Sequence, residues 1–274
     1  MGTESIIMKG RLFGDPYSAV NLWEFRRELR LIKRLIKIAE KYIAEKTTHS
    51  SETFEGVCFY IARSIVAYAK SAFDNMVLGH FDTTEMLIRK IVENRVVFEL
   101  IFNDEECTLW KYYLAHSHHK SLKSVDIGDK KRKDFEELCT RLEIDSEFIN
   151  RRGDKKPYIE QPYGWTYGIK TIKPVNRFKF KGLCDAVEGQ QQNYYDFQWM
   201  SRAVHGTSYF EKITNYSGDE RIMSLFSSIY INIYLLVIMY CSDTWGHEFE
   251  IITEELETIF YRFIEVYDKI YEQP

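Results

Sequence analysis

The stretch DTTEMLIRKIVENRVVFELIF, residues 82–102, is the strongest indication of the fold class. Its first residues, Asp82 to Glu85, have the form of a helix start with an acidic residue in the first turn. Its apolar residues form two faces, one made of Leu87, Ile91, Phe98 and Phe102, and one made of Ile88, Val92, Val96 and Leu100. Because a helix that is apolar over so much of its circumference is buried, we expect residues 82–102 to be enclosed by other helices.

Apolar positions spaced three and four residues apart predict helices on both sides of this stretch. They are expected over 18–46, 52–79, 105–124, 130–141, 179–188, 190–204, 219–242 and 248–271. Gly79 stands where the C-cap of the second helix belongs. The fold is therefore predicted to be all-α, a bundle of about seven to nine helices. We expect it to form a single helical domain over 1–274, made of the helix 18–46, a core over 52–210 and C-terminal helices over 219–272.

The segment 151–175 interrupts this pattern with Pro157, Pro162 and Pro174 among several glycines. Such a density of proline and glycine predicts an ordered connection and not a helix. The segment is also aromatic, with Trp165 at its centre, so we expect it to dock on the helices.

Residues 222–242 carry no charge over a length that could span a bilayer. However, Ser224, Ser228 and Asn232 recur every four residues and lay a polar stripe along one helix face. A lipid-facing helix would not carry that stripe, so we expect a buried helix and no membrane span.

The composition is that of a globular protein, with 45% hydrophobic and 28% charged residues and a net charge of −4. The five cysteines are isolated and are expected to be buried apolar residues of a reducing compartment. No secretory signal is recognisable near the N-terminus. We therefore expect a cytoplasmic protein, and no cofactor is predicted.

The helix expected over 18–46 has an uninterrupted apolar seam from Leu22 to Ile43 and many arginines and lysines between the seam positions. A basic outer face is often only a solvated surface. The alternatives are a homo-oligomer seam or a protein partner held through 18–46, and binding of nucleic acid.

Arg89 and Glu93 stand four residues apart on the buried helix and are expected to point into the protein. A buried ion pair costs desolvation. It either fixes the helix register, or Arg89 holds an anionic ligand while Glu93 transfers a proton. Arg95 and Glu99 repeat the spacing on a face that we expect to be less buried.

Ser201 and His205 form a second polar group, also four residues apart, with Tyr195 aligned near them. His205 falls at the end of a predicted helix, with Gly206 as its cap. It is either a capping histidine or a functional one. We expect Arg89, Glu93, Ser201 and His205 to converge.

His116 and His119 share a helix face and could hold a metal if carboxylates converged on them. No carboxylate accompanies them in a ligand pattern. A solvated helix end is the preferred interpretation, and no metal site is predicted.

Three short motifs together resemble a family of bacterial all-helical proteins known as a domain of unknown function. They are Arg89-x-x-x-Glu93, Gly164-Trp165, and Tyr195 followed by Ser201-x-x-Val204-His205-Gly206. The resemblance covers about 55–210. It implies an all-α fold and a shared polar site of arginine, glutamate, serine and histidine, without implying an activity.

Two functions remain open. The preferred one is a ligand- or partner-binding protein, with Arg89, Tyr195 and Trp165 at the ligand. The alternative is a nuclease-like or other hydrolytic effector of a bacterial defence or toxin system, such as phage defence, in which His205, Glu93 and Ser201 are catalytic.

Overall fold

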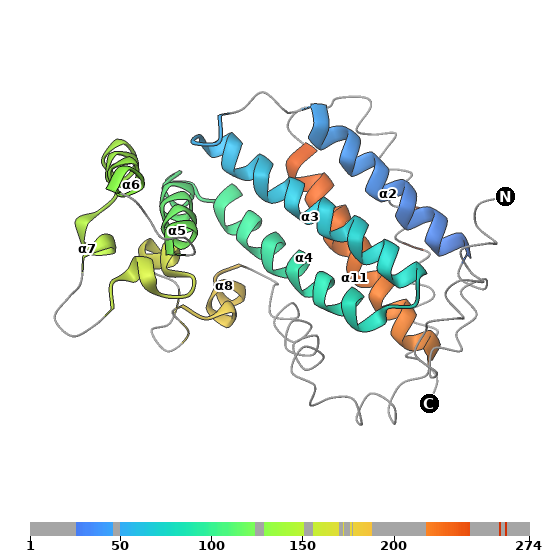
Figure 1. Ribbon diagram of the computed structural model, residues 1–274. Helices are drawn as coiled ribbons and strands as arrows, with labels where there is room; N and C mark the ends of the chain where they lie inside the picture. The colour runs from blue at the N-terminus through green and yellow to red at the C-terminus, as the bar shows by residue number, and fades with distance from the viewer. Residues whose placement is uncertain are drawn as a thin grey trace. The chain divides into compact units, whose positions relative to one another are not determined.

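A computed structural model describes residues 26–45, 50–123, 129–150, 156–169, 172, 176, 178–187, 218–241, 258 and 261. Over these residues the chain has eight α-helices and no strand, and 82% of them are helical (Figure 1). The predicted all-α fold is confirmed. The helices expected over 190–204 and 248–271 lie outside the described residues, apart from 258 and 261.

Seven of the expected helices are present, most with described ends within about two residues of the expected ones, whereas α5 begins later than expected and α7 is not among the expected helices. The α-helices are α2 (Arg26–Glu45), α3 (Phe54–Val77), α4 (Phe81–Phe102), α5 (Leu109–Lys123), α6 (Asp129–Arg141), α7 (Ser146–Ile149), α8 (Phe180–Ala186) and α11 (Gly218–Cys241). Two 3-10 helices, η1 (Tyr158–Glu160) and η2 (Gly164–Gly168), lie in the proline- and glycine-containing segment. The described part of that segment, 156–169, is therefore an ordered connection, as predicted.

The sequence suggests one domain over 1–274, and the chain clusters into two compact units. Unit 1 contains α2, α11, the part of α3 from Ala62 onward and the part of α4 up to Arg95. Unit 2 contains the remaining parts of α3 and α4 and the helices from α5 to α8. Each unit is described by itself.

Unit 1 is a four-helix arrangement closed by contacts between successive helices (Figure 1). Lys70 of α3 pairs with Glu40 of α2 at 2.8 Å. Thr84 of α4 donates a hydrogen bond to the Ala72 carbonyl of α3 at 3.4 Å. Arg95 of α4 donates a hydrogen bond to Asn232 of α11, and α11 packs along α2.

The apolar seam of α2 is buried within unit 1. The seam residues Ile32, Ile36, Ala39 and Ile43 are buried, as are Leu35 and Tyr42 beside them, whereas Leu29 is half-buried. α2 packs against α11. α11 contributes Phe226, Ile229, Tyr230 and Ile233 to the same interior. The charge-free run of the sequence is thus a packed helix of this unit.

None of the described helices combines the length and the apolar character that crossing a bilayer requires.

The turn between α3 and α4 confirms the predicted role of Gly79. Its φ is +81°, and its N–H donates to the Met76 carbonyl at 3.0 Å. The next N–H, of His80, donates to the Asn75 carbonyl at 2.9 Å. These two bonds form a Schellman motif, in which the left-handed residue ends the helix and satisfies its last carbonyls.

Unit 2 is organised around α5, which contacts α6, η1 and η2. The aromatic segment docks on it as predicted: Tyr112 of α5 lies 6.1 Å from Tyr167 of η2, and Tyr167 lies 4.5 Å from Tyr158 of η1, between ring centroids. Phe148 of α7 is buried in the same cluster. Residues 156–169 of the segment are therefore part of the core of unit 2.

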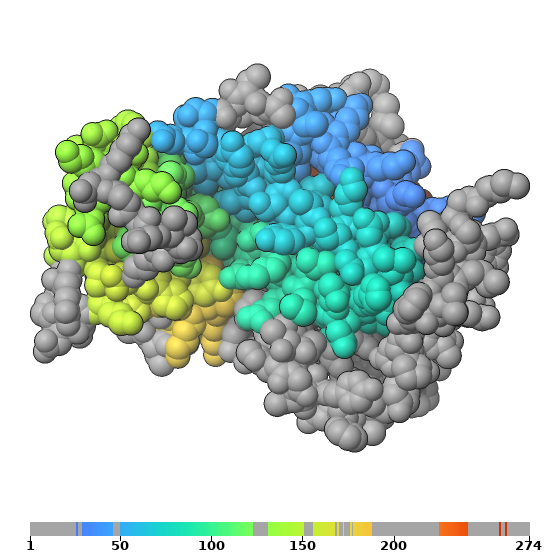
Figure 2. All heavy atoms as spheres, in the orientation of Figure 1, coloured from blue at the N-terminus to red at the C-terminus, as the bar shows by residue number. Residues whose placement is uncertain are grey.

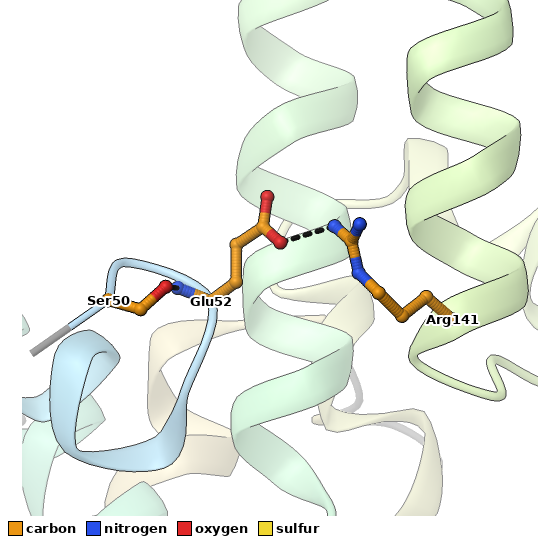
Figure 3. A network of polar contacts seen from close by, with 3 residues as sticks. All are labelled: Ser50, Glu52 and Arg141. Carbon is orange, nitrogen blue, oxygen red and sulfur yellow. Dashed lines mark hydrogen bonds and ion pairs between the residues drawn. The ribbon is translucent and has the colours of Figure 1, made fainter.

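A surface ion pair joins α6 to the residues that precede α3 within unit 2. Arg141 reaches from the end of α6 to the carboxylate of Glu52, whose own N–H donates to the Ser50 hydroxyl (Figure 3). Both charged side chains are exposed to solvent. An ion pair of this kind contributes little to stability, so the aromatic packing on α5 holds unit 2 together.

One part of the cysteine prediction is wrong. Cys58, Cys139 and Cys184 are buried, as expected, but Cys107 is exposed. Cys107 lies in the turn between α4 and α5 with a positive φ of 51°. Helical spacing predicts burial only for residues within a helix, and Cys107 lies in a turn that has no helix face to direct into the core.

Gly164 is required by a close approach of the backbone, and Gly79 is required by its positive φ. Substitution of each by alanine should therefore destabilise the protein to a different extent. A Cβ at Gly164 would overlap the Tyr158 carbonyl oxygen, whereas a Cβ at Gly79 meets no atom within 4 Å. We expect Gly164→Ala to lower the free energy of unfolding by at least about 2 kcal/mol. Gly79→Ala should lower it by about 1 kcal/mol, from the positive φ alone. Denaturant unfolding checks both, and equal losses would contradict the close packing of η1 on η2.

Candidate functional site

The charged residues of α4 are the starting point for a functional site. Arg89 and Glu93 are both half-buried and not enclosed. The Glu93 carboxylate accepts a hydrogen bond from Lys90 Nζ at 2.9 Å, and the exposed fractions of these two side chains are 18% and 54%. Arg89 and Glu93 are therefore sheltered but still accessible from solvent.

The burial of Arg95 contradicts the expectation that Arg89 is the more buried arginine of α4. The sequence places it on a less buried face of α4, but its side chain is only 1% exposed. Its Nε donates a hydrogen bond to Asn232 Oδ1 of α11 at 2.7 Å. The physical reason is the polar stripe of α11, which presents an acceptor to α4 inside unit 1.

Asn232 is itself held in one orientation. Its Nδ2 donates to the Ser228 carbonyl at 2.7 Å, one turn earlier on α11. Because an amide has one donor end and one acceptor end, this bond turns Oδ1 toward Arg95. The Ser228–Asn232 part of the stripe therefore positions the buried guanidinium.

Two further polar residues of α4 are fully buried at its N-terminal end. The Thr84 hydroxyl lies within hydrogen-bond distance of the His80 carbonyl at 3.0 Å. Glu85, next to it, has no exposed surface. α4 thus carries buried polar groups near its start and at Arg95, with the accessible pair Arg89 and Glu93 between them.

Tyr195, Ser201 and His205 lie outside the described residues. Their convergence on Arg89 and Glu93 accordingly stays a prediction.

Trp165 lies in the interior of unit 2, with 2% of its surface exposed. Its ring meets that of Tyr113 on α5 edge to face, with 5.5 Å between centroids. Together with the close approach at Gly164, this placement gives the Gly-Trp motif a packing role in unit 2.

The interpretation of His116 as part of a solvated helix end is wrong. His116 is 3% exposed, whereas its neighbour His118 is exposed. Its Nε2 donates to the Gln161 carbonyl at 2.9 Å, because a carbonyl oxygen can only accept. His116 therefore links α5 to the residues between η1 and η2 through this hydrogen bond. Across the described residues, no group of three or more histidine, cysteine or acidic side chains could hold a metal ion.

Tyr167 lies between two carboxylates, a contact that no pattern in the sequence indicates. Its hydroxyl lies 2.8 Å from Glu147 Oε2 and 3.2 Å from Asp145 Oδ2. The hydrogen bond to Glu147 and burial raise the pKa of Tyr167. Asp145 also caps α7 through the Glu147 N–H, so the phenol joins η2 to the start of α7.

Arg95 and Arg89 should differ sharply in their effect on stability. Arg95→Met removes the donor to Asn232 and leaves a buried oxygen unsatisfied, so we expect a loss of about 2–3 kcal/mol. Arg89→Met, at a half-buried position, should lower the free energy of unfolding by less than about 1 kcal/mol. Denaturant unfolding of both variants measures this difference. A larger loss for Arg89→Met would contradict the assignment of Arg95 as the structural arginine.

His116 should make the protein less stable in mildly acidic solution. Burial, with smaller effects of Lys120 and His119, lowers the pKa of His116 from 6.5 to about 4, although the bond to Gln161 opposes this. As the pH falls below 6.5, His116 is therefore protonated in the unfolded chain before it is protonated in the folded protein. Since one pKa unit corresponds to about 1.4 kcal/mol, His116 should remove up to about 3 kcal/mol of stability between pH 6.5 and 4.

The control is His116→Gln, which keeps a donor for the Gln161 carbonyl but does not titrate. Its free energy of unfolding should fall less than that of the wild type over this pH range. Parallel curves for the two proteins would contradict the buried, neutral state of His116.

No curated protein and no solved structure matches the chain. The model of one protein family matches residues 55–222, which is more than half of the chain and includes the whole of α4. The match confirms the resemblance suggested by the motifs, and the chain belongs to the family of unknown function DUF5677.

Proposed function

We propose that this chain is a binding protein whose ligand carries an anionic group, and that Arg89 of α4 contacts that group. The proposal rests on a difference in burial among the charged residues of α4. Glu85 and Arg95 are sealed in unit 1, whereas Arg89 and Glu93 are half-buried. A ligand can reach only the second pair.

The half-buried position suits recognition of an anion. A guanidinium offers five donors in a planar fork, and partial burial strengthens its hydrogen bonds relative to those of an exposed arginine. Lys90 pairs with Glu93 at 2.9 Å, so a lysine already offsets the charge of that carboxylate. Of the two half-buried residues, Arg89 carries the charge that attracts an anionic ligand.

The other predicted site residues have supporting roles in this proposal. Glu93 orients polar groups of the ligand beside Arg89. Tyr195, Ser201 and His205 are proposed to contribute further contacts to the ligand. A ligand contact of Trp165 would require access to its ring, which is only 2% exposed.

The test is a thermal shift with inorganic phosphate, pyrophosphate and ATP as three separate probes. A ligand at concentration c that binds only the folded state raises the free energy of unfolding by RT ln(1 + c/Kd), so stability increases with the logarithm of ligand concentration. We expect at least one probe to raise the Tm by on the order of a few degrees. Arg89→Gln should abolish the shift.

The matched control is Arg63→Gln, which removes the same charge from an exposed position of α3 in unit 1. It should retain the shift of the wild type. An Arg89→Gln protein that still responds, or a wild type that responds to none of the three probes, would contradict the proposal. Hydrolysis of ATP or pyrophosphate that disappears in His205→Ala would replace binding by the hydrolytic alternative.

A further inference from the structure

The outer side of α2 is a continuous basic surface. One side of the helix is buried against α11. The opposite side carries six exposed cationic residues, called here the α2 basic face: Arg26, Arg30, Lys33, Arg34, Lys37 and Lys41. Figure 2 shows part of α2, in blue, at the surface of the molecule.

The six side chains form a narrow row. At 100° per residue they fall within about 100° of the helix circumference, and from Arg26 to Lys41 the helix rises about 22 Å. Lys33 and Arg34 are adjacent, and the other successive cations are three or four residues apart, or about 5 Å along the axis. The row is rigid because the helix behind it is packed on α11.

Two acidic residues of the described part of α2, Glu40 and Glu45, lie near the C-terminal end of this row. Glu40 is directed to Lys70 of α3, with 2.8 Å between nitrogen and oxygen. Glu45 lies 4.0 Å from Lys41 at the last turn of the helix. The chain as a whole has a net charge of −4, so the positive charge of α2 is a local feature.

The composition of this face decides between classes of partner. The centre of a protein–protein interface is apolar and aromatic and is depleted of charge, whereas no aromatic side chain is among those described as exposed on α2. Attachment to a membrane by an amphipathic helix requires its apolar side to enter the lipid. In α2 that side is already buried against α11.

A nucleic acid duplex has the complementary charge distribution. It carries one negative charge per about 1.7 Å of its axis, in an unbroken line. Without aromatic side chains to stack on bases, the contact would be made to phosphates and would not depend on base sequence. We propose that the α2 basic face binds the phosphate backbone of a nucleic acid duplex. This inference is independent of the anionic ligand proposed for Arg89.

The test uses the full chain and a fluorescein-labelled DNA duplex of arbitrary sequence, followed by fluorescence anisotropy at several salt concentrations. The variant is the triple substitution Arg30→Gln, Lys33→Gln and Lys37→Gln. The matched control is Lys131→Gln, Arg132→Gln and Lys133→Gln, which removes three exposed charges from α6. Circular dichroism verifies that all three proteins keep their helical content.

We expect the wild type to bind with a Kd of roughly 10⁻⁴–10⁻⁶ M near physiological salt, and a second duplex of different sequence to bind equally well. The α2 triple variant should bind at least about tenfold more weakly, and the slope of log K against log salt should become shallower by nearly three. The α6 control should bind as the wild type does.

Equal losses in the two triple variants, or no binding of duplex by the wild type, would overturn the inference. So would binding to phosphatidylserine vesicles that depends on the α2 residues while duplex binding does not. An α2 triple variant that loses duplex binding and keeps the thermal shift of the Arg89 ligand would support two separate sites.

Discussion

The hydrogen bond from Arg95 to Asn232 is the interaction on which the arrangement of unit 1 depends. An arginine side chain that is 1% exposed cannot remain charged without acceptors, because desolvation of an isolated cation is expensive. Asn232 supplies one acceptor from α11, and its own bond to the Ser228 carbonyl keeps the amide turned toward α4. The interaction therefore fixes how α4 and α11 face each other, 137 residues apart in the chain.

Much of the fold follows from local sequence patterns. Apolar spacing predicts α3, α4, α6 and α11 to within about two residues, because a helix needs one continuous apolar face and a defined end. Gly79 marks the end of α3 for the same local reason. The docking of the aromatic segment on α5 is also predictable, since its tyrosines and Trp165 would otherwise remain in water.

The distribution of buried charge does not follow from local patterns. α4 has apolar residues on two faces, so the sequence alone leaves open whether Arg89 or Arg95 points to the centre of unit 1. The partner on α11 decides it, and that partner is distant in sequence. The recurrence of Ser224, Ser228 and Asn232 is the signal in the sequence, because a polar stripe on a buried helix needs polar partners. The burial of His116 likewise depends on a distant partner, the Gln161 carbonyl 45 residues away.

The central claim is that Arg95 is a structural residue held by Asn232, which leaves Arg89 as the arginine of α4 that can serve a ligand. A double-mutant cycle with Arg95→Met and Asn232→Leu, measured by denaturant unfolding, tests this most directly. Each single variant leaves one polar group unsatisfied, whereas the double variant removes both, so we predict a coupling free energy of about 1.5–3 kcal/mol. Additive losses, with no coupling between the two positions, would contradict the account.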